Sequence, residues 1–382
     1  ERETGTHLLK TVTDKVGRKT TFTHDSNGNI QTTTDPAGNV TKYEYDLTFN
    51  KPTKITDALG NAATLTYDNK GNLIEFRNPQ SAIRISYNSH GQPISITDAL
   101  GNKTTLEYDS KGNLIKTTDP LGNVTSRSYD PVSRLIEIIN PKGKKTKYIY
   151  DLKDRITEII NPRGKKTLFS YDANGNLLTV TDAKNQIITY TYNGWDKVVS
   201  MTDQLGKTEH YEYDLNQNLK KVTDRKGQVT EYTHDFLDRL IKTKYADNSS
   251  ISYQYDAGGR LATVTDTDTG IISLSYDNLD RLITELTSLG AINYEYNAIG
   301  HRTKMQVAGQ EPVNYNYDAN GRLTNLIQGD KAVSFAHDEI GRRKQMSLPN
   351  GVTTNYTYDS ASQLLNTETL NPLNAILDRV SY

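Results

Sequence analysis

The chain has 382 residues, of which 34% are hydrophobic, and 45 basic residues nearly cancel 46 acidic ones to leave a net charge of −1. This balance excludes the strongly basic surface typical of proteins that bind nucleic acids or anionic membranes. The absence of cysteine excludes disulfide scaffolds, thiolate metal sites and cysteine nucleophiles. No apolar run approaches the roughly 20 residues that a membrane-spanning helix needs.

The apolar content is low for a globular protein, in which about 45–50% is usual, so thin sheets with much polar surface are expected rather than thick cores. The 25 tyrosines, together with abundant Thr, Ile and Val, oppose disorder and favour strands. The chain opens at Glu1 without Met or a signal-like segment. We therefore expect it to be a piece of a longer protein.

A dyad of an aromatic residue followed by Asp or Asn recurs along the whole chain, beginning with His24-Asp25. Seventeen dyads are separated by 16 spacings, of which 12 are 21 residues, three are 20 and one is 22. His also supplies the ring at His234 and His337. Tyr supplies it in the remaining dyads, at Tyr45, Tyr67, Tyr87, Tyr108, Tyr129, Tyr150, Tyr171, Tyr192, Tyr213, Tyr255, Tyr276, Tyr296, Tyr317 and Tyr358. A period this regular predicts that the repeat is the fold.

Each unit contains two turn signals, represented by Asp109-Ser-Lys-Gly112 directly after the dyad ring and by Asp119-Pro-Leu-Gly122 ten residues later. Asp at the first position, Pro at the second and Gly at the fourth are typical of a type I turn with a left-handed Gly. The runs of about five residues between the turns are rich in Thr, Tyr, Ile, Val and Leu, which predicts strands. Each repeat is therefore expected to be a β-hairpin in an antiparallel meander.

The turn geometry also predicts the register. With Ser110 to Gly112 as the loop, Tyr108 lies opposite Leu114, and the residue at this position is aliphatic in 13 of 17 units. We expect a ladder of rings and aliphatic side chains on one face, formed by the tyrosines 45, 67, 108, 129, 150, 171, 213, 255, 276, 317 and 358 with Leu73, Leu114, Leu135 and Leu177. Because a period of 21 residues is odd, the rings of successive repeats would point to opposite faces of the sheet. One even-length loop or one bulge per repeat must therefore return them to the same face. The sequence leaves open which turn carries it.

The predicted fold class is all-β, with tandem hairpins of about 21 residues forming a spiralling antiparallel sheet, the wall of a hollow shell or barrel. Residues 1–382 form a single continuous array that begins and ends inside repeats, and the segment 360–382, which lacks its turn Gly, is expected to be irregular. Thirty-four strands at about 4.8 Å make a ribbon roughly 160 Å long. Such a ribbon must coil, and closed end to end it would be about 50 Å across, too wide for side chains to fill.

The Tyr-Asp dyad followed by x-x-Gly-x-Leu, with Asp-Pro-x-Gly ten residues later, resembles the Rhs and YD-repeat family of bacterial polymorphic toxins, Tc-toxin shell components and teneurins. The resemblance covers essentially the whole chain. It implies a spiralling β-shell that, in the bacterial members, encloses a toxic C-terminal polypeptide and is followed by a self-cleaving core. Neither that core nor a toxin domain is found here. Asp35-Pro-Ala-Gly38 and Asp119-Pro-Leu-Gly122 match its Asp-Pro-x-Gly signature only superficially, because they stand at regular turn positions.

Candidate catalytic and metal-binding residues have simpler structural interpretations. Carboxylates such as Asp109 and Asp119 suit turn formation by bonding to backbone N–H groups better than they suit glycoside hydrolysis. The three dyad histidines are interpreted as substitute rings, and Thr265-Asp-Thr-Asp-Thr-Gly270 as a polar turn rather than half a calcium loop. We therefore expect no enzyme activity, no metal and no cofactor.

Basic residues gather at the second turn of two consecutive repeats: Lys142, Lys144 and Lys145, then Arg163, Lys165 and Lys166. Their charges should stack about 10 Å apart on one rim of the sheet. Such a rim suits an acidic glycan, a phosphate or a partner's acidic edge, although a solvated rim that discourages edge pairing is the favoured interpretation. The single tryptophan, Trp195, lies in a dyad turn, where filling a local gap is favoured over stacking on a sugar.

The leading functional hypothesis is a non-catalytic wall segment that encapsulates and sequesters a toxin or effector polypeptide, which is not part of this chain. The alternative is an extracellular adhesive or structural protein that binds glycans or associates with itself. We expect no nucleic-acid partner and no membrane span. The expected location is outside a bacterial cell, secreted or at the cell surface.

Overall fold

The computed structural model describes all 382 residues and consists of strands and turns alone. The strands of the first third are β1 (Thr11–Thr13), β2 (Lys19–His24), β3 (Ile30–Thr34), β4 (Val40–Tyr45), β5 (Pro52–Thr56), β6 (Ala62–Tyr67), β7 (Leu73–Asn78), β8 (Ser81–Tyr87), β9 (Pro93–Thr97), β10 (Lys103–Tyr108), β11 (Leu114–Thr118) and β12 (Val124–Tyr129). They are followed by β13 (Leu135–Ile139), β14 (Lys145–Tyr150), β15 (Ile156–Ile160), β16 (Lys166–Tyr171), β17 (Leu177–Thr181), β18 (Ile187–Tyr192), β19 (Val198–Thr202), β20 (Thr208–Tyr213), β21 (Leu219–Thr223), β22 (Val229–His234), β23 (Leu240–Lys244) and β24 (Ser250–Tyr255). The last third contains β25 (Leu261–Asp266), β26 (Gly270–Tyr276), β27 (Leu282–Thr287), β28 (Gly290–Tyr296), β29 (Arg302–Val307), β30 (Val313–Tyr317), β31 (Leu323–Gln328), β32 (Lys331–His337), β33 (Arg343–Ser347), β34 (Thr353–Tyr358), β35 (Leu364–Leu370) and β36 (Ile376–Ser381).

All 36 strands belong to one sheet in which each strand pairs antiparallel with its neighbours in sequence. No connection crosses over, so the sheet is a continuous meander that remains open at its two ends. The predicted all-β fold of tandem hairpins is confirmed. No helix is present, and so none is long and apolar enough to cross a membrane.

The turns have the expected geometry at both ends of a repeat. In the dyad turn, the Asp109 N–H donates to the Asn113 carbonyl and the Gly112 N–H donates to the Asp109 carbonyl, both at 3.0 Å. In the second turn, Asp119, Gly122 and Asn123 form the same two bonds, also at 3.0 Å. Gly112 has a φ of 89°, in the left-handed region that a side chain disfavours. Both loops therefore have three residues, an odd number. Neither of them compensates for the odd 21-residue period, which would otherwise place successive rings on opposite faces of the sheet.

A β-bulge after the dyad turn corrects it. Tyr108 pairs with Leu114 while the preceding Glu107 pairs with Lys116, which leaves Ile115 as the extra residue. The same shift occurs in every dyad hairpin from His24 to Tyr358. The question that the sequence left open is thus answered: one bulge per repeat, on the strand that follows the dyad turn, returns each ring to the same face.

The segment 360–382, expected to be irregular, keeps the strand pairing of the repeat but contains an additional β-bulge at Leu377 in the pair β35–β36. β35 pairs with both β34 and β36, and its turn needs no Gly because Ser362 adopts a φ of 65°. The next turn, Asn371–Ala375, has the same pair of backbone bonds as the others. The unit runs long because β35 has seven residues, not because the pairing is lost.

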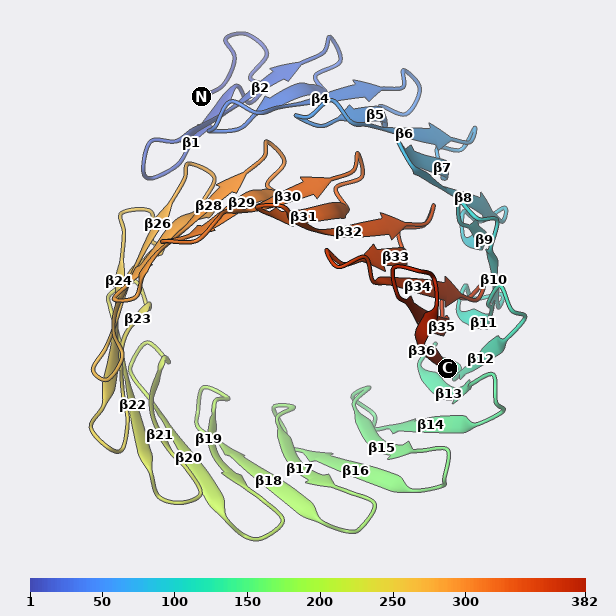
Figure 1. The fold of residues 1–382 in the computed structure, drawn as a ribbon. Coiled ribbons are helices and arrows are strands. Elements are labelled where there is room, and N and C mark those ends of the chain that lie inside the picture. Colours follow the sequence, from blue (N-terminus) through green and yellow to red (C-terminus); the bar gives the residue numbers. More distant parts are fainter.

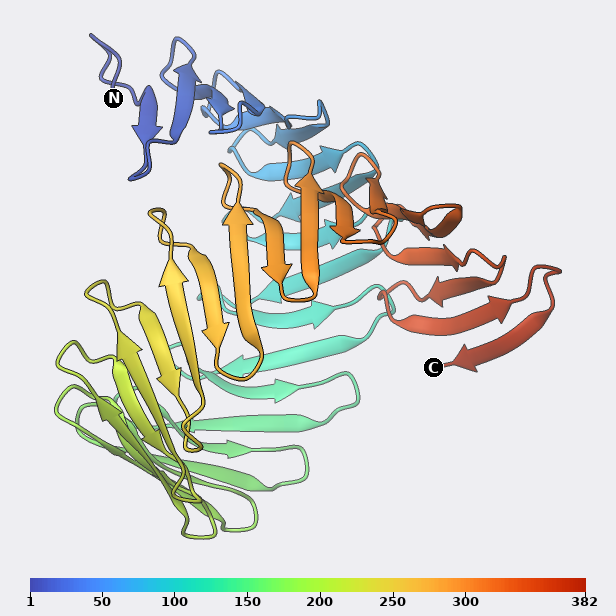
Figure 2. The same cartoon turned by 60° about the vertical axis from the view of Figure 1, so that its left-hand side comes forward.

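The sheet coils into a spiral of more than one turn (Figure 1). Figure 2 shows the C-terminal hairpins forming a second coil beside the first, and hydrogen bonds join the two coils at Arg18–Asp280 and Gln80–Arg322. Arg18 and Asp280 are 262 residues apart. This separation corresponds to roughly 25 strands per turn, so at about 4.8 Å per strand the coil is about 38 Å across.

The wall is a single layer. Only five of the 382 residues are buried, namely Thr11, Gly71, Ala82, Ser95 and Thr243. No second sheet or helix covers either face, so the half-buried side chains pack only on neighbours within the sheet. Since barrels of 16–18 strands already leave an aqueous channel, a coil of about 25 strands per turn encloses space that its own side chains do not fill.

Candidate functional site

The wall itself is the candidate functional element, and the dyad tyrosine is its most regular link between repeats. The Tyr129 hydroxyl donates to the Leu114 carbonyl of the preceding repeat at 3.0 Å, and the Tyr192 hydroxyl donates to the Leu177 carbonyl at 2.8 Å. Thirteen of the 14 dyad tyrosines make this bond, the exception being Tyr45. The carbonyl that accepts it belongs to the first residue of the bulge. Each hydroxyl therefore satisfies a backbone group where the strand pairing is locally disrupted.

The predicted ladder residues occupy these positions. Tyr67, Tyr108, Tyr129 and Tyr171 lie opposite Leu73, Leu114, Leu135 and Leu177, respectively. Burial raises the pKa of several of these rings, including Tyr150, Tyr192 and Tyr276. The neutral phenol required for donation is thereby favoured.

The dyad aspartate organises the turn. Oδ1 of Asp109 accepts the backbone N–H groups of Lys111 and Asn113, both at 2.9 Å, and Oδ2 accepts the Asn113 side chain at 2.8 Å. The Asn113 side chain and these backbone donors hold the pKa of Asp109 below its usual value. The carboxylate is thus fully engaged by its own turn, as the turn-former interpretation requires.

In many later repeats an arginine replaces this asparagine, and its side chain also contacts the following repeat. Arg155 donates through Nε to Asp151 at 2.7 Å and through Nη1 to the Asp172 carbonyl at 3.0 Å. Its guanidinium also lies 4.6 Å from the centre of the Tyr171 ring. One side chain therefore connects a dyad turn, the following dyad turn and the following dyad ring. The signal for this clamp in the sequence is Asp-x-x-x-Arg, which was not among the predicted features.

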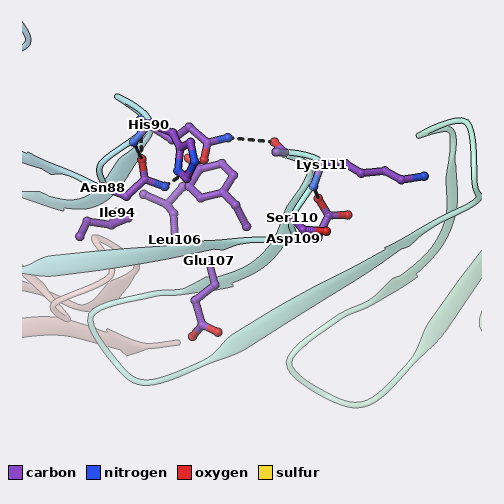
Figure 3. Close-up of a pocket in the computed structure, with 11 residues that line it drawn as sticks. Asn88, His90, Ile94, Leu106, Glu107, Asp109, Ser110 and Lys111 are labelled. Carbon is purple, nitrogen blue, oxygen red and sulfur yellow. Dashed lines mark hydrogen bonds between the residues drawn. The ribbon is translucent and has the colours of Figure 1, made fainter.

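The two faces of the wall differ in chemistry. Alternation places Leu106 and Tyr108 on one face and Glu107 on the other, where Glu107 pairs with Lys116 at 2.8 Å. Figure 3 shows Glu107 pointing away from Leu106. Ser170 and Thr179 likewise share a hydrogen bond of 2.6 Å on the polar face. One face is therefore aromatic and aliphatic, and the other carries hydroxyl and ion pairs.

A seam joins the two coils, and turns meet along it. Arg18, in a second turn of the first coil, contacts the dyad turn of the later coil, with Nη1 2.6 Å from Asp280 Oδ1 and Nη2 3.1 Å from Oδ2. The hydrogen bond from Arg18 holds the pKa of Asp280 low. Farther along, the dyad turn containing Ser362 lies beside two consecutive second turns, at Asp98 and Asp119. In both places a later dyad turn lies beside two consecutive second turns of the earlier coil.

The basic rim residues lie at the second turns after β13 and β15, as the repeat requires. Lys145 pairs with Glu137 at 3.5 Å and Lys166 pairs with Glu158 at 2.8 Å, so both belong to ion pairs of the sheet. The other four, Lys142, Lys144, Arg163 and Lys165, are exposed and form no ion pair. Trp195 is also exposed, at 52%, in its dyad turn.

The structure separates the other candidate residues. Asp109 and Asp119 flank opposite ends of β11 and hence lie at opposite rims. The dyad histidines occupy ring positions, with His234 opposite Leu240 for example. Asp266 accepts backbone N–H groups within its own turn, at 2.7 Å from Asp268. No group of three or more His, Cys, Asp or Glu side chains is arranged to hold a metal ion.

A shallow depression of about 690 Å³ lies between adjacent hairpins, and Figure 3 shows its lining. Its walls include Leu106 of the apolar face and Asn88, whose Oδ1 accepts a hydrogen bond of 2.9 Å from the backbone N–H of His90. Gln92 closes one side by donating to the Gly112 carbonyl at 3.1 Å. These residues are the structural parts of two repeats, so the depression is a groove of the wall.

Comparison with known families agrees with this architecture. The family model described as teneurin YD-shell matches residues 77–182 and 224–382, well over half of the chain. The chain belongs to this YD-shell family. The model described as RHS repeat also matches, at residues 5–40, 24–50 and 171–208, in agreement with the resemblance inferred from the dyads. No curated protein matches the chain.

Solved structures share the YD-shell fold at low sequence identity. The crystal structure of TcdB2-TccC3-TEV is 15% identical with a TM-score of 0.68, and the match covers 96% of this chain and 22% of that one. The Tc holotoxin pore of Photorhabdus luminescens is 14% identical with a TM-score of 0.52, covering 95% and 26% of the two chains. The YD-shell chain therefore spans about a quarter of the length of these solved chains. The likeness shows a shell-type, structural fold.

Proposed function

We propose that this chain is a non-catalytic segment of a shell wall that encloses and sequesters a toxin or effector polypeptide. The observation that carries the proposal is the single-layer wall, which coils with roughly 25 strands per turn and leaves both faces uncovered. The shell family and the Tc-toxin structures with the same fold support it. The proposed location is outside the cell, and the proposed partner is the enclosed polypeptide.

The proposed mechanism is steric. A coil about 38 Å across with a wall about 10 Å thick leaves a lumen roughly 28 Å wide. A folded domain of 100 residues has a radius of gyration of about 13 Å, which corresponds to a diameter of roughly 34 Å, so it does not fit across this lumen. An extended or partly folded chain does fit. Enclosure would therefore prevent the cargo from folding and keep proteases away until the wall opens.

The adhesive alternative gains no comparable support. The exposed cations and Trp195 lie on the rims, and the groove at Leu106 is lined by residues of the turns and strands of two repeats. Neither the family nor the solved structures favour glycan binding.

The test is protease protection combined with imaging of the natural gene product that contains this chain. We expect cryo-electron microscopy to show density inside the coil and limited trypsin digestion to spare the enclosed segment. Arg18→Glu, which places like charges at the seam, should open the wall and expose that segment. Lys220→Glu is the control, because Lys220 is exposed on β21 away from the seam and forms no ion pair. A solid assembly without internal density, or equal protection in both variants, would refute the proposal.

A further inference from the structure

The three histidines at dyad ring positions have different charged surroundings. His24 lies beside a carboxylate, with Nδ1 3.7 Å from Glu3 Oε1. His234 lies opposite the aliphatic Leu240, and the dyad turn before it carries asparagine where other turns carry the clamp arginine. Only His337 lies opposite a cation. A proton on the imidazole therefore has a different consequence at each of the three positions.

His337 lies between two guanidinium groups. Its register partner is Arg343, at a position that is aliphatic in 13 of 17 units. In the preceding dyad turn, Arg322 donates through Nε to Asp318 at 2.7 Å and through Nη1 to the Asp338 carbonyl at 2.8 Å. In six other repeats the arginine at this position lies 4.4–5.0 Å from the centre of a tyrosine ring. Here the ring at the tyrosine position is the imidazole.

The charge of the imidazole decides whether this arrangement is stable. A neutral ring is compatible with guanidinium groups on both sides, whereas an imidazolium is repelled by both. Burial lowers the pKa of His337 from its ordinary value of 6.5, and Arg322 and Arg343 lower it further. Asp318 and Asp338 oppose this effect, but each carboxylate is already bonded to the arginine of its own turn. Because the folded chain binds this proton less well than the unfolded chain, the fold loses stability here as the pH falls below about 6.5.

Arg322 also connects this position to the seam. Its Nη2 donates to Oε1 of Gln80, 242 residues away, in the turn between β7 and β8 of the earlier coil. The neighbouring His301 packs on the Tyr317 ring, with 4.8 Å between the ring centres, and so belongs to the preceding ring position. One guanidinium thus contacts both the surroundings of His337 and the other coil. A charge that displaces Arg322 therefore weakens the contact between the coils.

We propose that His337 is a pH-sensitive latch of the wall: protonation of its imidazole, between Arg322 and Arg343, loosens the wall on acidification. The elements that weaken are the strands β31 to β33 and the seam contact between Arg322 and Gln80. At neutral pH the same contacts hold the two coils together. The proposal concerns the wall alone and does not depend on an enclosed cargo.

Native-state hydrogen exchange of the full 382-residue chain tests the latch, with rates at about pH 7.5 and about pH 5.5 each divided by the chemical exchange rate at that pH. Peptides covering β31 to β33 should lose protection roughly fivefold at the lower pH, the size expected when two partly exposed like-charge contacts of ordinary strength appear. Arg343→Leu, which introduces the aliphatic residue of most units, should reduce this ratio to roughly twofold, because one of the two contacts is gone.

His337→Tyr should remove the pH dependence. It introduces the residue that 14 of 17 dyads carry, so the variant is expected to fold. Any hydroxyl bond that it gains is present at both pH values and cancels in the ratio. His234→Tyr is the matched control and should keep the fivefold change at β31 to β33. An equal pH ratio in the unmodified chain and in His337→Tyr overturns the proposal, as does a ratio that the control abolishes.

The seam itself is followed by the distance between two spin labels. The chain contains no cysteine, so Leu100→Cys and Glu339→Cys place labels only at these two exposed turn residues, one on each coil. Double electron–electron resonance should show longer and broader distances at about pH 5.5 than at about pH 7.5. Adding His337→Tyr should abolish this change, and adding His234→Tyr should not. A distance that is the same at both pH values, or that changes equally in the two variants, overturns the proposal.

Discussion

Replacing Tyr192 by Phe removes one hydroxyl and leaves the ring, so it isolates the bond between repeats. The hydroxyl donates to the Leu177 carbonyl at 2.8 Å, next to the bulge opposite Tyr171. Tyr190, two residues earlier on β18, points to the same face, and its hydroxyl makes no hydrogen bond within the chain. Tyr190→Phe is therefore a matched control.

The expected loss is about 1 kcal/mol, the net value of a typical intramolecular hydrogen bond. It should be local, because in a repeat array each unit contacts only its neighbours and opening need not be global. At 25 °C this corresponds to a roughly fivefold larger equilibrium constant for local opening of the strands around the bond. A global unfolding midpoint would average the change over the whole array.

Native-state hydrogen exchange monitored by mass spectrometry measures this change in local opening for individual peptides. Peptides covering β17 and β18 should exchange roughly fivefold faster in Tyr192→Phe, while peptides at β3 and β33 should be unchanged. Tyr190→Phe should differ little from the unmodified chain. Equal exchange in the two variants would show that the dyad position requires only a ring.

Two further predictions concern the turns and the arginine clamp. The pKa values of Asp68, Asp109 and Asp172 are lowered in the folded chain, first by the hydrogen bond from the Asn side chain of their own turns. These carboxylates therefore stabilise the fold at pH values above the pKa of the unfolded chain, about 3.8, and this stabilisation is lost as the pH falls through their lower folded pKa values. Urea midpoints followed by circular dichroism should therefore fall between pH 5 and pH 3, and a flat profile there would contradict the assignment. Arg155→Lys should cost about 1 kcal/mol, because Lys lacks the planar fork that reaches Asp151, the Asp172 carbonyl and the Tyr171 ring together. Exposed Arg163→Lys is the control, and equal local exchange near β15 and β16 in both variants would contradict this role.

Most of the hairpin could be predicted because its determinants are close in sequence. The Asp109 carboxylate, the left-handed Gly112 and the pairing of Tyr108 with Leu114 all lie within one short loop and its flanks. The hydroxyl bond was missed, although a dyad ring that is Tyr in 14 of 17 units and never Phe was a usable signal. Packing alone would accept Phe.

The sequence by itself determined the strands, the two turns and the face on which each ring lies, since the 21-residue period repeats the same local chemistry. Only the tertiary structure decided where the bulge falls, how many strands complete a turn and which turns meet at the seam. Arg18 and Asp280 come together across 262 residues because small twists accumulate over roughly 25 strands. No single residue encodes that sum. The polar seam therefore appears only once the coil is formed.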